Sequence, residues 1–404
     1  MLMETQRNTS LMEEQVEAEL YRIADWWSIH AFDGEKGGFY GEVAEDNCAD
    51  KDAERGVVMH SRILWFFSSV AHQSGSDRYR KMADHAYAYL FEKFDDKEHG
   101  GVYWSVDCNG IPVETKKQTY AIAFAIYGLC AYYRLTKIKN ALELARSYFS
   151  LIQEHCYDKT DGGYLEAFSR TWHPLSDVRL SEKDDNLPKT QNTHLHVMEA
   201  FTALHDTDPT AATEEALQNL IVLFRKYIIS PDTHHLHLFM DMQWKDHSNT
   251  YSYGHDIECS WLLLEAIETL KNQEIHDEYL PLVIKMAYTT LSEGIGKHGQ
   301  VCDECNIATG QRDQVSCWWV QAEAMVGFLY AFQLTDDKAF WDAFNQVWDF
   351  TQQQHIDKSL GEWHWFEKSS KERLTPSYKA GFWKGPYHNG RAMMEVLSLL
   401  KNLN

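Results

Sequence analysis

The segment DKTDGGYLEAF, residues 158–168, occurs in related forms along the whole chain. It begins with an aspartate four residues before a glycine and continues into an aromatic-rich stretch that alternates apolar and polar residues. Copies of one segment at similar intervals along a chain indicate a repeat architecture, here with six units. The other copies are DGEKGGFYGEV at 33–43, DKEHGGVYWSV at 96–106, DKSLGEWHWFE at 357–367, and weaker versions from Asp232 and Gly296.

Two helical patterns lie between successive copies. One has apolar residues three and four apart and one charged face, as in a helix with a wet side, and it covers residues 11–27, 78–94, 140–155, 213–228, 278–294 and 338–354. The other is apolar nearly all round, as in a buried helix, and it covers residues 61–73, 119–133, 193–205, 258–270, 318–332 and 389–403.

Six buried helices that alternate with six amphipathic helices predict an all-α fold, an (α/α)6 barrel with an inner and an outer ring. A closed ring avoids the exposed ends of an open solenoid, which need capping repeats. The short alternating segments are expected as loops or small strands at one rim. No low-complexity linker interrupts the pattern, so residues 1–404 are expected to form one catalytic domain, with residues 1–14 as a flexible N-terminal segment.

The composition restricts the kind of ligand. A formal net charge of −22 argues against nucleic acid or an anionic membrane as a partner and suits a neutral ligand. The sequence contains no run of about 18 apolar residues, so it predicts no membrane span. The first residues lack the apolar core of a signal peptide, so a cytoplasmic location is expected. The eight cysteines, with a lone C-x-x-C at Cys302 and Cys305, are expected to be reduced structural thiols. None of these features specifies an oligomeric state.

Each apolar helix begins with chemically functional residues. Inner helices of an alternating barrel all run in one direction, so these residues are expected to meet at one mouth above an apolar floor, the usual shape of a ligand pocket. His194 and His196 lie two residues apart in QNTHLHVMEAF and point about 200° away from each other on a helix, so only one can face the barrel axis. The residues at the six starts are Arg62, Tyr120, Asn192 with His194 and His196, His255 with Glu258, Trp318 with Trp319, and His388.

Other chemistries have less support in the sequence. A metal centre is disfavoured because a His-x-His pair diverges on a helix and the chain has no H-E-x-x-H motif. A nucleophile elbow and a phosphate-binding loop are also absent from the sequence. Glycoside hydrolysis stays open, since Glu258 and Asp184 could form a carboxylate pair and barrels of this kind also host hydrolases. The mouth is richer in histidine than in acids, which favours proton transfer near neutral pH.

Six segments of the chain resemble the N-acylglucosamine 2-epimerase superfamily, and within it the cellobiose and mannose 2-epimerase branch. The resemblance implies an (α/α)6 barrel and an enzyme that interconverts the glucose and mannose configurations at C2 of a reducing-end aldose without a cofactor or metal. The segments run in order from about residue 15 to the end and read SRILWFFS, KQTYAIAFAIYG, NTHLHVMEAF, GHDIECSWLL, WWVQAEAMVGF and WKGPYHNGR.

The same resemblance implies the catalytic residues. His255 and His388 match two acid–base histidines on opposite sides of C2, and His196 matches a third active-site histidine. Arg62 matches an arginine near O1 and O2 of the sugar, and Glu258 a glutamate that supports the histidine network. The expected chemistry is removal of the C2 proton from the open-chain aldehyde, a cis-enediolate, and return of a proton to the opposite face.

The expected sugar contacts are Asn192, Tyr120, Trp319, Trp383 and Asp184. The chain departs from the family pattern at His60, where an asparagine is expected, and at Gly385, where a cysteine is expected. Both are expected near the mouth, with His60 as a further sugar contact, so a monosaccharide and a β-1,4-linked disaccharide both stay open as substrates. An aldose–ketose isomerase that converts mannose to fructose and a non-catalytic sugar-binding barrel are the alternatives.

Overall fold

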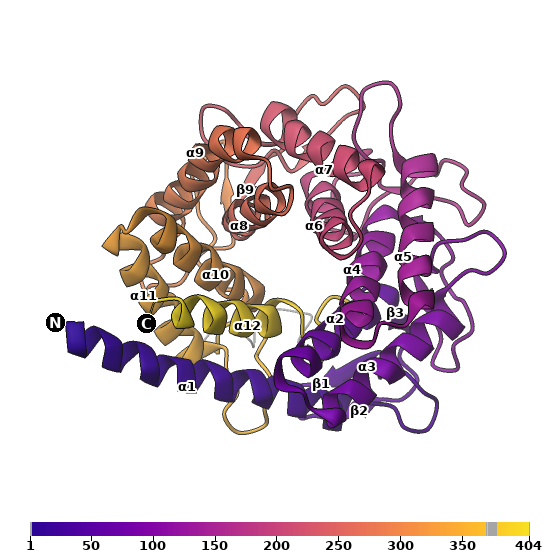
Figure 1. The fold of residues 1–404 in the computed structure, drawn as a ribbon, viewed down its shortest axis with the longest axis horizontal. Coiled ribbons are helices and arrows are strands. Elements are labelled where there is room, and N and C mark those ends of the chain that lie inside the picture. The colour runs from indigo at the N-terminus through magenta and orange to yellow at the C-terminus, as the bar shows by residue number, and fades with distance from the viewer. Residues whose placement is uncertain (1, 369, 371–377, 404) are drawn as a thin grey trace.

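The computed structural model describes residues 2–368, 370 and 378–403. These residues form twelve α-helices in two concentric rings (Figure 1), which confirms the (α/α)6 barrel. The inner ring consists of α2 (Val57–Ser74), α4 (Thr119–Thr136), α6 (Gln191–Thr207), α8 (Tyr253–Thr269), α10 (Trp318–Thr335) and α12 (His388–Lys401). The outer ring consists of α1 (Leu2–Trp26), α3 (Asp77–Tyr89), α5 (Lys139–Leu151), α7 (Ala211–Leu223), α9 (Gln273–Thr289) and α11 (Lys338–Gln354).

The two helix patterns differ in burial as expected. Every residue of α4 from Thr119 to Tyr132 is buried, whereas α5 buries only the stripe Ala141, Leu142, Ala145, Tyr148 and Phe149. Residues 2–14, part of the segment 1–14 that was expected to be flexible, lie in helix α1, which begins at Leu2 and runs beside α12 (Figure 1). The flexibility of this segment stays a prediction.

The repeated segment forms a turn that a buried ion pair holds in four of the six units. The carboxylates of Asp33, Asp96, Asp158 and Asp357 contact Arg55, Lys117, Lys189 and Lys379 at 2.5, 2.8, 2.8 and 2.8 Å, respectively. In each turn the first residue donates its backbone N–H to a carbonyl five residues on, or four in the Gly296 unit. By this bond the fourth unit starts at Ser230, not at Asp232 as the sequence pattern suggested, so Ser230 and Gly296 replace the aspartate in two units.

Short antiparallel strands join neighbouring repeats at the rim where the inner helices begin. The strands that lead into α2, α4, α6 and α8 each pair with a strand from the next repeat, and β11 pairs with β1, which joins the last repeat to the first. These pairs place the starts of α2, α4, α6, α8 and α12 at one rim, and an isolated bridge between Cys317 and Phe366 does the same for α10. The strands are β1 (Glu42–Ala44), β2 (Ala49–Asp50), β3 (Arg55–Gly56), β4 (Ser105–Val106), β5 (Lys117–Gln118), β6 (Ala167–Phe168), β7 (Lys189–Thr190), β8 (Phe239–Met240), β9 (Thr250–Ser252), β10 (Glu304–Asn306) and β11 (Tyr378–Ala380).

Two further expectations concern the whole chain. Among the described residues, no helix combines the length and the apolarity that crossing a membrane would require. All eight cysteines are free thiols, and Cys302 and Cys305 of the C-x-x-C are both buried.

Candidate active site

A cavity of about 190 Å³ lies where the inner helices begin. It brings together ten residues expected at the mouth or as sugar contacts, and each of the six inner helices contributes at least one wall residue. Trp365, which no motif predicted, also lines it and belongs to the last copy of the repeated segment. The wall consists of Arg62, Tyr120, Asn192, His196, His255, Glu258, Trp318, Trp319, Trp365, Trp383 and His388.

His388 opens helix α12, and a carboxylate holds its ring. Its Nδ1 lies 2.6 Å from Oε1 of Glu323, a residue of α10 that also accepts bonds from Arg391 and Trp261. Arg391 and Trp261 both donate to this carboxyl and stabilise its ionised form, although burial raises the pKa of Glu323. An ionised carboxylate only accepts, so His388 donates from Nδ1 and turns Nε2 toward the cavity. Burial, with Arg62 and Arg391 nearby, holds the pKa of His388 well below 6.5.

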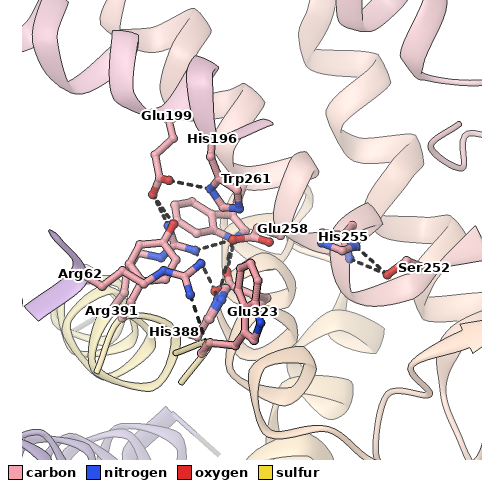
Figure 2. Close-up of polar contacts among 12 residues, drawn as sticks. Arg62, His196, Glu199, Ser252, His255, Glu258, Trp261, Glu323, His388 and Arg391 are labelled. Atoms are coloured by element: carbon pink, nitrogen blue, oxygen red, sulfur yellow. Dashed lines mark hydrogen bonds and ion pairs between the residues drawn. The ribbon is translucent and has the colours of Figure 1, made fainter. Parts of the chain in front are cut away.

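His255, in the first turn of α8, is held by a hydroxyl group. Its Nδ1 lies 2.8 Å from Oγ of Ser252, the residue that caps α8, and Figure 2 shows this pair on the other side of the site from His388. A hydroxyl can donate or accept, so either tautomer of His255 fits this contact. Burial lowers the pKa of His255 to about 3, with a smaller effect of His196. Trp319 contacts both histidines, with its ring centroid 4.7 Å from that of His255 and 5.5 Å from that of His388.

The two histidines of QNTHLHVMEAF diverge as the helical spacing predicted. His196 lines the cavity, and its Nδ1 lies 2.9 Å from Oε2 of Glu199, one turn along α6. His194 is buried in the wall, where Nδ1 meets the carbonyl of Thr190 at 2.7 Å and Nε2 accepts the N–H of Tyr164 at 2.9 Å. His194 is therefore a satisfied structural residue.

Arg62 supplies positive charge to the cavity. Its Nη2 donates to the hydroxyl of Tyr120 at 2.9 Å and its Nη1 to the carbonyl of Trp383 at 3.4 Å. The guanidinium also lies 4.3 Å from the ring centroid of Phe124, so its orientation is fixed from two sides. Four cavity-wall residues have a buried side-chain atom without a hydrogen-bond partner among the described residues: Nε of Arg62, Oδ1 of Asn192, Oε2 of Glu258 and Nε1 of Trp318. Such groups need partners, and a polyhydroxylated ligand can provide them.

Behind the cavity wall lies a cluster that the sequence analysis did not predict. Arg391 of α12 is buried among the carboxylates of Glu199, Glu258 and Glu323, and Figure 2 shows the three converging on its guanidinium. The sequence does contain a signal for this cluster, namely ionisable residues inside helices that are otherwise apolar all round. Burying such charges is costly unless they are paired, so they indicate mutual contact.

The part of the chain that the structure describes contains one group with the spacing of a metal site: Glu258, Glu323 and His388. Nη2 of Arg391 already contacts Oε1 of both glutamates at 2.7 Å. This guanidinium supplies the positive charge that such a group of oxygens would otherwise take from a cation.

Two expected sugar contacts lie elsewhere. His60 is fully buried in the wall, where Nδ1 meets the carbonyl of Gly56 at 2.9 Å and Nε2 accepts the N–H of Phe39 at 3.2 Å; like His194, it anchors a repeat turn. The prediction that it reaches the mouth is wrong. Asp184 does not line the cavity either, because its carboxylate accepts the N–H of Ser181 inside its own loop. Glu258 bonds to Arg391, so the possible pair of Glu258 with Asp184 is not formed.

Gly385, the other departure from the family pattern, does lie against the site. A Cβ atom at this position would meet Cβ of Arg62 at 3.4 Å, an ordinary contact distance. The glycine therefore leaves a space behind the arginine that a small side chain would fill.

The model of the N-acylglucosamine 2-epimerase family matches residues 38–392. The chain is 41% identical over 388 residues to a cellobiose 2-epimerase of Bacteroides fragilis, which covers 96% of this chain and 99% of that protein. The solved cellobiose 2-epimerase of Bacillus thermoamylovorans superposes with a TM-score of 0.91 at 35% identity, covering 96% of this chain and 99% of that one. A solved D-mannose isomerase shares the fold, with a TM-score of 0.82 at 21% identity over 95% of this chain and 97% of that one. The chain belongs to the N-acylglucosamine 2-epimerase family.

Proposed function

We propose that this carbohydrate 2-epimerase inverts C2 of the reducing-end glucose unit of cellobiose or a similar β-1,4-linked disaccharide. One observation carries the proposal. His255 and His388 line one cavity, Trp319 contacts both rings, and the protein holds each ring through Nδ1, which leaves two Nε2 atoms for the substrate.

The two imidazoles suit the chemistry of an aldose. C2–H becomes acidic when C1 is an open-chain aldehyde, and its removal gives a cis-enediolate. Inversion then requires a proton on the opposite face, so one imidazole accepts the C2 proton at an unprotonated Nε2 and the other donates a proton that it carries on Nε2. Exchange with solvent restores both protonation states between turnovers, and the roles are exchanged in the reverse reaction. When His388 accepts the proton, the carboxylate of Glu323 at 2.6 Å stabilises the imidazolium.

The enediolate carries negative charge on O1 and O2. Arg62 and His196 are the groups we assign to stabilise it, because a preorganised donor acts strongly where water is excluded. Trp319, Trp365 and Trp383 provide apolar faces in the same cavity. These faces pack on the C–H surface of a sugar and exclude water from the intermediate.

The surroundings of the cavity favour a disaccharide over a free hexose. Trp383 lines both the 190 Å³ cavity and a neighbouring groove of about 700 Å³, whose other walls include Trp104, Lys116, Arg170 and Glu182. A second sugar unit attached to the reducing-end unit can continue past Trp383 into this groove. The sequence relatives named as cellobiose 2-epimerases support the same choice.

An aldose–ketose isomerase is the second candidate. It would use the same enediolate but return the proton to C1, and the fold shared with a D-mannose isomerase keeps it in view. A second base facing C2 favours epimerisation, because isomerisation does not need one. A non-catalytic sugar-binding barrel would not need either base.

An NMR time course in D2O with cellobiose, glucose and mannose as substrates tests the proposal. We expect cellobiose to give the C2 epimer fastest, with deuterium at C2 in the first product and protium kept at C1. Ketose with label at C1 would establish the isomerase instead. Protium kept at C2 would contradict the two-histidine mechanism, and an unchanged spectrum for all three sugars would contradict the function.

A further inference from the structure

Arg391 is fully buried and lies outside the residues that line the cavity. Its Nη1 contacts Oε1 of Glu199 and the hydroxyl of Tyr387, and its Nη2 contacts Oε1 of Glu258 and of Glu323, both at 2.7 Å. One guanidinium thus joins carboxylates from α6, α8 and α10 to α12.

Two of these carboxylates continue to the candidate catalytic histidines. The second oxygen of Glu199 lies 2.9 Å from Nδ1 of His196. Oε1 of Glu323, the atom that Arg391 contacts, lies 2.6 Å from Nδ1 of His388. Two chains of contacts, Arg391–Glu199–His196 and Arg391–Glu323–His388, therefore start from one side chain (Figure 2).

We propose that Arg391 is a positioning residue that orients His196 and His388 together, through Glu199 and Glu323, so that both donate from Nδ1 and present Nε2 to the sugar. The assignment rests on the proposed function of the two histidines. Arg391 itself does not touch the substrate in this scheme.

An arginine is required at this position for geometric reasons. Its planar fork contacts three carboxylates at once, whereas a lysine offers one compact point charge. Its charge also matters: burial alone would raise the pKa of Glu199, but Arg391, His196 and Tyr387 together lower it to about 2, and Arg391 has the largest effect of the three. Glu199 therefore stays an acceptor for His196.

The charged and titratable groups around His388 define what a substitution would change. Burial has the largest effect and lowers the pKa of His388, and Arg391 lowers the pKa of both His388 and His196 further. Removing the positive charge should therefore raise the pKa of both imidazoles, whereas a lysine should not. The surrounding groups are Arg62, His196, Glu199, Glu258, Glu323, Tyr387 and Arg391.

The first test uses NMR of 15N-histidine-labelled protein without substrate. His196 and His388 are assigned by signals lost in His196→Asn and His388→Asn. We expect both as neutral Nδ1–H tautomers in the wild type. Glu199→Gln should change His196 alone, Glu323→Gln should change His388 alone, and Arg391→Met should change both.

The second test is kinetic and uses Arg55→Lys as the matched control. Arg55 is equally buried and paired with Asp33, and three other repeats carry lysine at its position, so this variant should fold and keep wild-type kcat. Arg391→Lys should fold and lose kcat about 100-fold, since small misplacement of catalytic groups has effects of that size. In Arg391→Lys, the fall of kcat at acidic pH should occur at the same pH as in the wild type. In Arg391→Met, this fall should move to higher pH.

The outcomes separate the two hypotheses. A wild type that epimerises no aldose contradicts the proposed function, while the NMR test of the tautomers still stands. Unchanged histidine signals in Arg391→Lys and Arg391→Met overturn the positioning role. So does a pattern in which Arg391→Lys and Arg55→Lys lower thermal stability alike and both keep kcat. If Arg391→Met does not fold, Glu199→Gln and Glu323→Gln are used instead. Unchanged NMR signals of His196 in Glu199→Gln and of His388 in Glu323→Gln would then overturn the proposal.

Discussion

At the scale of single residues, the two proposed bases, His255 and His388, differ in the group that holds Nδ1. Glu323 commits His388 to one tautomer, whereas the hydroxyl of Ser252 lets His255 use either. A base that must pass through the imidazolium benefits from a carboxylate partner. A base that must exchange its proton between turnovers benefits from a partner that can donate or accept.

Replacing either base should stop the reaction. We expect His255→Asn and His388→Asn each to reduce epimerisation by at least about 1000-fold, within the range that positioned general acids and bases contribute, with unchanged circular dichroism. His72→Asn is the control, because His72 is exposed and lies at the far end of α2. Retention of more than a few per cent of activity in either variant would remove that residue from the mechanism.

His194 and His196 form a natural matched pair. His194→Leu leaves the N–H of Tyr164 and the carbonyl of Thr190 without their partner, so it should cost about 1–3 kcal/mol of unfolding free energy and keep kcat. His196→Leu should lose kcat strongly, and because it leaves Oε2 of the buried Glu199 without its partner it should also lose stability. Urea denaturation and initial rates measure both variants, and an equal effect of the two on kcat would contradict the division of roles.

The pH dependence follows from the burial of the bases. Burial lowers the pKa of His255 to about 3 and holds that of His388 well below 6.5. The imidazole that accepts the C2 proton must be neutral, which it is above its pKa, so a lowered pKa of that imidazole extends activity to lower pH. We expect kcat/KM to stay level from pH 8 down to about 6, below the ordinary histidine value of about 6.5. An acid limb centred at or above about 6.5, in protein that circular dichroism shows to be folded, would contradict this environment.

At the scale of secondary-structure elements, the repeat turns carry stability and not chemistry. Lys189 is fully buried in β7 and contacts Asp158 at 2.8 Å and the carbonyl of Met242 at 2.8 Å. Burial raises the pKa of Asp158, but Lys189 and backbone N–H groups outweigh it and the net pKa is lowered. The carboxylate is therefore charged at neutral pH, and the stability it contributes is lost as pH falls through its native pKa.

Removing Lys189 leaves the buried carboxylate of Asp158 without its cationic partner. Lys189→Met should lower the free energy of unfolding by about 3 kcal/mol at neutral pH, with a smaller loss in acid, where Asp158 is protonated. Lys159→Met, an exposed neighbour in the same turn, is the control and should change stability little. Urea denaturation at pH 7 and in acid checks this, and a loss that does not depend on pH would argue against the ion pair.

At the scale of the whole molecule, ring closure brings Arg391 of the last helix among glutamates from three earlier helices. We expect full activity after exhaustive dialysis against EDTA, because this guanidinium already neutralises the only three-ligand group found among the described residues. Initial rates before and after dialysis measure it. Loss of activity that a divalent cation restores would show that the site uses a metal.

Much of the architecture follows from the sequence alone. The repeated turn and the two hydrophobic periodicities predicted twelve helices in two rings, because burial on all sides and burial on one side leave different patterns in the chain. The direction of the inner helices then predicted that Arg62, His255 and His388 meet at one mouth. These are local or additive properties, so a single sequence can reveal them.

Tertiary structure alone decided the rest. The helical spacing showed that His194 and His196 diverge, but which of them faces the axis depends on how α6 is rotated against its neighbours. His60 and Asp184 do not line the cavity. In the structure, His60 accepts the N–H of Phe39 and Asp184 accepts the N–H of Ser181. The cluster around Arg391 joins residues up to 192 positions apart, and contacts of that range arise only when the ring closes and buried charges must find partners.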